Sequence, residues 1–120
     1  MKKKMTEIST IQEGFKMIID RYNSEEKIRK KLANYDEPIE LTFLDNNHKA
    51  MIIVKKDQGI EIKDNVGDDN ALVKIHFESE QVMINLFNGE IGAVGAYSSG
   101  KIKVIAGKIR NLIKLRKLLF

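Results

Sequence analysis

Apolar residues near the N-terminus recur at helical spacing. Thr10 and Glu13 fit a capping box, and an apolar stripe follows them. A break at 23–26 is followed by a second helical piece, which ends before Pro38. The stripe and the second piece contain Ile11, Phe15, Ile18, Ile19, Tyr22, Ile28 and Leu32. The pattern therefore predicts a helical N-terminal part in two pieces.

The pattern then changes to short runs with a period of two, separated by turn residues. These runs are 39–43, 49–56, 59–64 and 71–78. In the first of them Ile39, Leu41 and Phe43 alternate with Glu40 and Thr42. Such alternation is typical of strands with one buried face. We expect a meander of about four strands.

The segment 79–97 fits two structures. Ser79 suits a helix N-cap, and Asn88-Gly89 suits its C-cap. The same Asn-Gly pair between two apolar runs is also a strong hairpin signal. Local reasoning leaves both possibilities open.

The chain closes with a strand-like run at 101–107 and an amphipathic helix from Lys108 onward. Arg110, Lys114 and Lys117 form a basic face on this helix, while Arg116 falls inside its apolar arc. The arc comprises Ile109, Leu112, Ile113, Leu115, Leu119 and Phe120.

Composition indicates one soluble globular domain over 1–120, with a basic segment at 1–9 that we expect to be flexible. The 120 residues are 42% hydrophobic and 32% charged. Cysteine is absent, which excludes disulfides and thiolate metal sites. No apolar run approaches the length of a membrane span, so we expect a cytoplasmic protein.

Charge is distributed unevenly along the chain. The net charge is +4, yet residues 1–90 carry a balance of −3, and no acidic residue follows Glu90. A basic, apolar C-terminus fits a nucleic-acid-binding tail, a membrane-surface helix or the closing helix of the domain.

Catalytic and metal-binding signals are weak, so we predict neither an enzyme nor a cofactor. His48 is expected in a turn and His76 on the polar face of a strand, both solvated and without a triad arrangement. The acidic segment 64–70 does not match the EF-hand spacing and is interpreted as a polar turn. A GxGxxG or phosphate loop is absent.

The C-terminal half nevertheless carries a recognisable block. It consists of Gly89, Tyr97, Gly100, Lys101, Ile102, Lys103, Val104 and Gly107. With the upstream helix and strands, this block resembles the sterol carrier protein type 2 domain, from about Phe15 to Leu119. The resemblance implies an α+β fold whose five-stranded mixed or antiparallel sheet is covered on one face by four to five helices. It also implies that 80–87 is helical and that an apolar tunnel lies between the layers.

A lipid tunnel requires apolar walls, because burying an acyl chain contributes about 0.8 kcal/mol per methylene. Under the resemblance, the predicted lining is Phe15, Ile18, Val82, Met83, Leu86, Phe87, Ala93, Val94, Tyr97, Leu112, Leu115 and Leu119. Arg116 is the candidate for an anionic head group.

The expected function is binding and transfer or presentation of a fatty acid, acyl-CoA or phospholipid rather than a sterol. We expect a monomer or weak homodimer, which contacts anionic membranes and a lipid-metabolising enzyme. Two alternatives stay open: a structural or regulatory domain with a closed core, and nucleic-acid binding through the basic C-terminus.

Overall fold

The computed structural model describes residues 7–55 and 58–119, apart from the side chain of Ile109. In chain order the elements are α1 (Ile11–Ser24), α2 (Glu26–Lys31), β1 (Ile39–Phe43), β2 (His48–Lys55), β3 (Gly59–Asp64), β4 (Val73–Phe77), α3 (Glu80–Phe87), α4 (Ala93–Ser98), β5 (Ile102–Ala106) and α5 (Ile109–Leu119). Within the described ranges no helix is long and apolar enough to cross a lipid bilayer. The predicted apolar positions Ile109 and Phe120 lie outside the described side chains.

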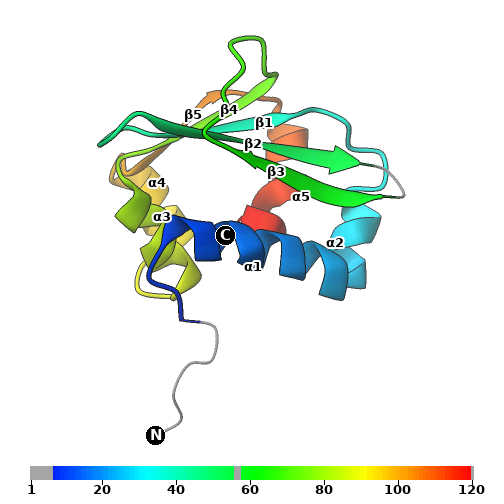
Figure 1. Ribbon diagram of the computed structural model, residues 1–120, viewed down its shortest axis with the longest axis horizontal. Helices are drawn as coiled ribbons and strands as arrows, with labels where there is room; N and C mark the ends of the chain where they lie inside the picture. Colours follow the sequence, from blue (N-terminus) through cyan, green and yellow to red (C-terminus); the bar gives the residue numbers. More distant parts are fainter. Residues whose placement is uncertain (1–6, 56–57, 120) are drawn as a thin grey trace, which may run out of the picture.

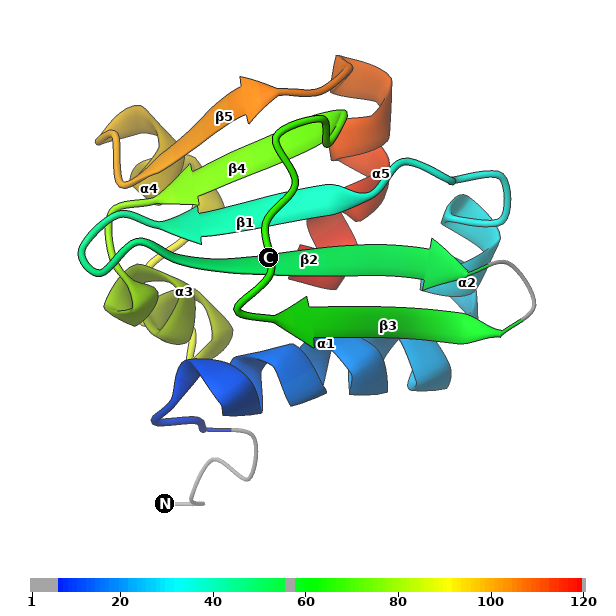
Figure 2. The same cartoon turned by 45° about the horizontal axis from the view of Figure 1, so that its top comes forward.

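The five strands form one mixed sheet in the order β3-β2-β1-β4-β5 (Figure 2). The first three strands form the predicted antiparallel meander, but the fourth does not continue it. β4 lies on the other side of β1 and runs parallel to it. The expectation of a four-stranded meander was therefore wrong, since strand patterns predict which residues are paired but not which strand is the neighbour.

All helices cover one face of the sheet, as the α+β prediction required (Figure 1). The inner face carries the apolar half of each alternating strand. At one end of the sheet, Phe43 at the end of β1 pairs with His48 on β2 and with Phe77 on β4. The Phe43 and Phe77 rings stack with their centroids 5.3 Å apart, and Phe15 of α1 lies 6.5 Å from Phe43. This aromatic contact holds the first half of α1 against the end of the sheet, while the helix as a whole contacts the edge strand β3.

The outer face of the sheet is partly covered by the loop that joins β3 to β4. This loop crosses over β2 and β1 in Figure 2. The buried Glu40 carboxylate accepts a hydrogen bond of 2.7 Å from the Asp68 backbone N–H. The segment 64–70 therefore acts as an anchored crossover loop, and it explains why every residue of β1 is buried.

Of the two structures predicted for the segment 79–97, a helix or a hairpin, the helix is observed. The Ser79 side chain accepts a hydrogen bond from the Val82 N–H, and Gly89 has a φ of 76°. The Gly89 N–H donates to the Leu86 carbonyl, and the Glu90 N–H donates to the Asn85 carbonyl. This pair of bonds is a Schellman motif, which requires a left-handed residue directly after the C-cap.

Ile8, which lies within the segment 1–9 that we expected to be flexible, packs against the domain. Ile8 is buried, and its backbone N–H and carbonyl both bond to the side chain of Asn88, at 2.7 and 2.8 Å. Thr10 and Glu13 then form the predicted capping box of α1. Residues 1–6 lie outside the described residues.

Candidate functional site, a groove between α4, β5 and α5

The helical layer leaves the inner face of the edge strand β5 incompletely covered. Val104 is in register with Ile75 of β4, and Ile102 with Phe77, so both β5 side chains continue the apolar rows of the inner face. The helix that contacts this strand, α4, is short and consists mostly of small residues. The other neighbouring helix, α5, packs against α1 and α2. Small side chains on one side and a displaced helix on the other leave space over β5.

This space is an apolar groove of about 290 Å³, which we call the β5 groove. Its lining residues are Ala93, Val94, Tyr97, Ile102, Val104, Leu112, Ile113 and Arg116. Every lining side chain except Arg116 is apolar or aromatic, and the volume is at the lower end of the range usual for small-molecule sites. Among the residues that the structure describes, the apolar space is open to the surface, and the predicted tunnel between the layers is not seen.

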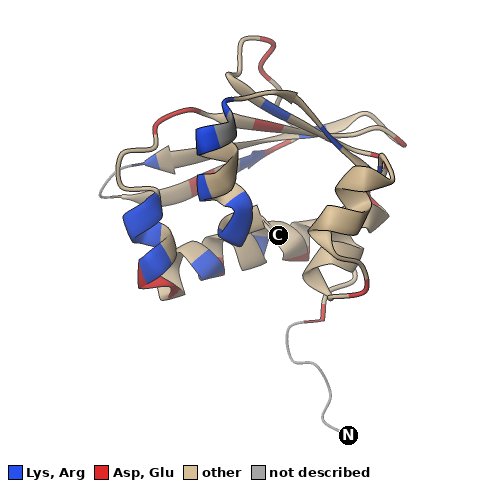
Figure 3. Ribbon diagram, turned by 180° about the vertical axis from the view of Figure 1, so that it is seen from behind, with Lys and Arg blue, Asp and Glu red and all other residues tan. Residues whose placement is uncertain are grey.

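One end of the β5 groove is cationic. A second cavity, of about 550 Å³, shares Ala93, Val94 and Arg116 with the groove and adds Arg21, Gly92 and Lys117. No carboxylate of the described residues lies within ion-pair distance of Arg21, Arg116 or Lys117. We call these three side chains the cationic end. Figure 3 shows basic positions along α5 and the adjacent α2, with uncharged α4 beside them.

Arg21 is held in place more firmly than a surface arginine. Its guanidinium lies 4.6 Å from the centre of the Phe87 ring and donates a hydrogen bond of 3.3 Å to the Leu118 carbonyl. Burial lowers the pKa of Arg21 from its usual value, although an arginine stays protonated in water near neutral pH. The stacking and the carbonyl contact leave part of its donor fork free for an anion.

The predicted lining residues fall into two groups. Ala93, Val94, Tyr97 and Leu112 line the β5 groove together with the head-group candidate Arg116. The others are buried members of the hydrophobic core. This second group consists of Phe15, Ile18, Val82, Met83, Leu86, Phe87, Leu115 and Leu119.

Sequence reasoning missed Ile102, Val104, Ile113, Arg21 and Lys117 as site residues. Ile102 and Val104 belong to the predicted strand-like run at 101–107, but nothing local indicated that the helices leave this strand partly uncovered. Arg21 follows Ile18 by three positions on α1, so it borders the apolar stripe. This position, a basic residue at the border of an apolar stripe, is the feature of the sequence that could have indicated Arg21 as a site residue.

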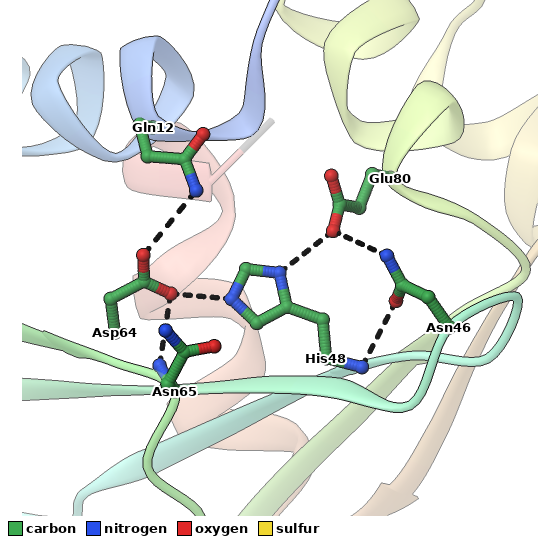
Figure 4. Close-up of polar contacts among 6 residues, drawn as sticks. All are labelled: Gln12, Asn46, His48, Asp64, Asn65 and Glu80. Carbon is green, nitrogen blue, oxygen red and sulfur yellow. Dashed lines mark hydrogen bonds and ion pairs between the residues drawn. The ribbon is translucent and has the colours of Figure 1, made fainter.

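The prediction of a solvated His48 was wrong. His48 is the first residue of β2, and its side chain is only 10% exposed. The centres of its ring and the Phe43 ring are 5.5 Å apart. Nδ1 contacts Glu80 Oε2 at 2.7 Å, and Nε2 contacts Asp64 Oδ1 (Figure 4). Both ring nitrogens thus face carboxylates, which leaves neither available for proton transfer to a ligand.

The surroundings of His48 favour its charged form. Burial by itself lowers the pKa of His48, but the hydrogen bonds and charges of Glu80 and Asp64 outweigh it, and the pKa is raised above 6.5. Burial likewise raises the pKa of Asp64, while the contacts with His48 and Gln12 outweigh it and lower the pKa below 3.8. The imidazolium therefore ties the end of β3 to the start of α3.

We expect the free energy of unfolding to fall as pH rises through the raised pKa of His48. When folding raises the pKa of a histidine, the resulting stabilisation is complete below the pKa of the unfolded state. It is lost as pH rises through the pKa of the folded state. The Asp64 contribution has the opposite sense and is lost as pH falls through its lowered pKa. The ion-pair contribution is therefore largest between about pH 4 and 6.5.

Urea unfolding at a series of pH values measures this contribution. His48→Gln is expected to lose on the order of 2 kcal/mol at pH 5.5, because hydrogen bonds with charged groups each contribute about 1.5–3 kcal/mol and Asp64 is partly solvated. His76→Gln is the matched control, since burial lowers the pKa of His76. A His48→Gln profile parallel to the wild-type profile would contradict the assignment.

Comparison with known proteins identifies the fold. At the level of sequence, no family model and no curated protein matches the chain. A double mutant of the sec-alkylsulfatase PisA1 matches with a TM-score of 0.73 and 13% identity; it covers 97% of this chain, which spans only 17% of the sulfatase chain.

Two further matches are similar in length to this chain. Palmitated SCP2L2 from Aedes aegypti has a TM-score of 0.69 and 12% identity, with 92% of this chain and 95% of that chain covered. Sterol carrier protein domain 2 of Helicoverpa armigera has a TM-score of 0.63 and 16% identity, with 99% and 91% covered. At these identities the likeness shows the fold, and this chain has the sterol carrier protein 2 fold.

Proposed function

We propose that this protein binds one long-chain anionic lipid, with its acyl chain in the β5 groove and its head at the cationic end. The observation that carries the proposal is the continuity between an apolar groove and three cations that have no carboxylate partner among the described residues. An acyl chain contributes affinity by burial of methylenes, and the cations supply charge-assisted hydrogen bonds to a carboxylate or phosphate.

The groove suits a carrier rather than a selective enzyme site. Because each methylene contributes only about 0.8 kcal/mol, the affinities of lipids of neighbouring chain lengths differ by only a few-fold. Fatty acids, acyl-CoA esters and phospholipids have anionic heads, whereas a sterol offers one uncharged hydroxyl. The protein therefore binds the first three in preference to sterols and transfers or presents them unchanged. The palmitated neighbour from Aedes aegypti supports an acyl ligand for this fold.

The test begins with native mass spectrometry of the freshly purified protein and solvent extraction of any bound molecule. A mass excess that extracts as an acyl lipid is the expected result. Delipidated protein is then titrated with a fluorescent fatty acid, with one ligand expected per chain. A clean mass together with no uptake would favour the alternative of a closed, structural domain.

Competition by palmitic acid and by hexadecanol separates the head from the chain. The alcohol has the same chain but no charge, so its dissociation constant is expected to be at least about tenfold higher, since hydrogen bonds to charged groups contribute about 1.5–3 kcal/mol. Equal competition by the acid and the alcohol would show that the cationic end does not bind the lipid head. The same comparison with Arg21→Gln should show a smaller difference between acid and alcohol.

A further inference from the structure

Three exposed apolar side chains surround the opening of the β5 groove. Val94 and Tyr97 of α4 are 73% and 63% exposed, and Ile113 of α5 is 61% exposed. All three also line the groove, so they converge on its opening from two helices. Large apolar side chains exposed together at one place are typical of a binding surface, whereas scattered ones need no explanation.

Cations surround this apolar centre. On α5, Ile113 has Arg110 three positions before it, and Arg116 and Lys117 three and four positions after it, so these side chains are its neighbours on the helix surface. All three basic residues are exposed. Since no acidic residue follows Glu90, neither α4 nor α5 contributes a negative charge.

We propose that this surface docks on an anionic lipid bilayer, with Val94, Tyr97 and Ile113 in the headgroup region. We call it the docking face, formed by these three residues together with Arg110, Arg116 and Lys117. An apolar centre with a cationic margin is complementary to a bilayer whose surface is negative. A second copy of the chain is a poor occupant, because two such faces would bring their cations together.

Docking in this orientation would place the groove opening against the lipid, where an acyl chain could enter without crossing water. The inference extends the proposed function, but vesicle binding and ligand binding are measured separately. Uptake of a fluorescent fatty acid added below its critical micelle concentration needs no vesicle. A failure of one therefore does not imply failure of the other.

The first experiment is flotation with phosphatidylcholine vesicles, with and without about one third phosphatidylserine. Binding to the anionic vesicles is expected to be at least about tenfold stronger and to weaken with added salt, because each basic side chain near the surface contributes to the attraction. Ile113→Glu should lose this binding by at least about tenfold. Leu72→Glu is the matched control, since Leu72 is 59% exposed, lies in the loop that joins β3 to β4 and is not part of the groove.

A spectroscopic probe locates the contact. The chain has no tryptophan, so Tyr97→Trp and Leu72→Trp each introduce a single reporter. Only Trp at 97 is expected to shift its emission to the blue on anionic vesicles and to be quenched by brominated lipid. Equal flotation of Ile113→Glu and wild type, or no preference for anionic vesicles, would overturn the proposal. Self-association blocked by Ile113→Glu, with no vesicle binding, would assign the face to a second copy instead.

Discussion

Val104→Glu is expected to weaken binding of a long-chain fatty acid, with a dissociation constant raised at least about tenfold by a carboxylate in an apolar site. Val104 lies on the inner face of β5, in register with Ile75, and lines the β5 groove. A carboxylate there replaces apolar contacts with the chain and repels the anionic head. The groove is open to the surface, so the introduced charge can reach water and the fold should be retained.

The neighbouring position provides the control. Ile105 is the next residue on the same strand, is not among the residues that line the groove and is 52% exposed. Ile105→Glu introduces the same charge at the same sheet edge without entering the groove, so its fatty acid affinity should remain that of the wild type. Fluorescent fatty acid titration of both variants, with thermal unfolding to confirm the fold, is the measurement. An equal loss of fatty acid affinity in the two variants would show that the added charge, and not its position in the groove, causes the effect.

The fold was predicted from the sequence where local signals agree. The capping box at Thr10 and the strands at β1 and β5 are confirmed. The single buried face expected from the alternation in β1 was wrong, because the crossover loop also covers its outer face. The choice between helix and hairpin at Asn88-Gly89 was different. Both depend on a residue with positive φ, so only the tertiary contacts of α3 decide between them.

Two features of the fold were not available from local patterns. Alternation in β4 indicates a strand with one buried face, but the pairing with β1 instead of β3 depends on the crossover loop anchored at Glu40. His48 follows a turn and precedes a strand, which predicted a solvated side chain. Its two carboxylates come from residues 16 and 32 positions away, so no local window contains the cluster.

The candidate site was predicted only in part, because core residues and ligand-contacting residues are of the same types. Leu112 and Leu115 are three residues apart on α5. The first lines the β5 groove, whereas the second is fully buried in the core. The difference arises from how α5 is placed on α1 and α2, a tertiary contact that the amphipathic pattern does not specify.

Met83→Ala is expected to destabilise the protein by about 2–5 kcal/mol while leaving fatty acid affinity within about twofold, since truncation of a packed core side chain removes its contacts and leaves a cavity. Met83 is fully buried and belongs to the core cluster. A methionine that lined an open tunnel would behave differently. Its truncation would cost little stability and would change the affinity or the preferred chain length.

Val94→Ala completes this comparison, because Val94 was predicted for the same tunnel wall but is 73% exposed at the β5 groove. Its truncation should change the free energy of unfolding by less than about 0.5 kcal/mol, as is usual for surface substitutions. Urea unfolding and fatty acid titration of both variants therefore distinguish a filled interior with a groove at its edge from a tunnel between the layers. A stable Met83→Ala protein with altered chain-length preference would place the lipid beneath α3 rather than over β5.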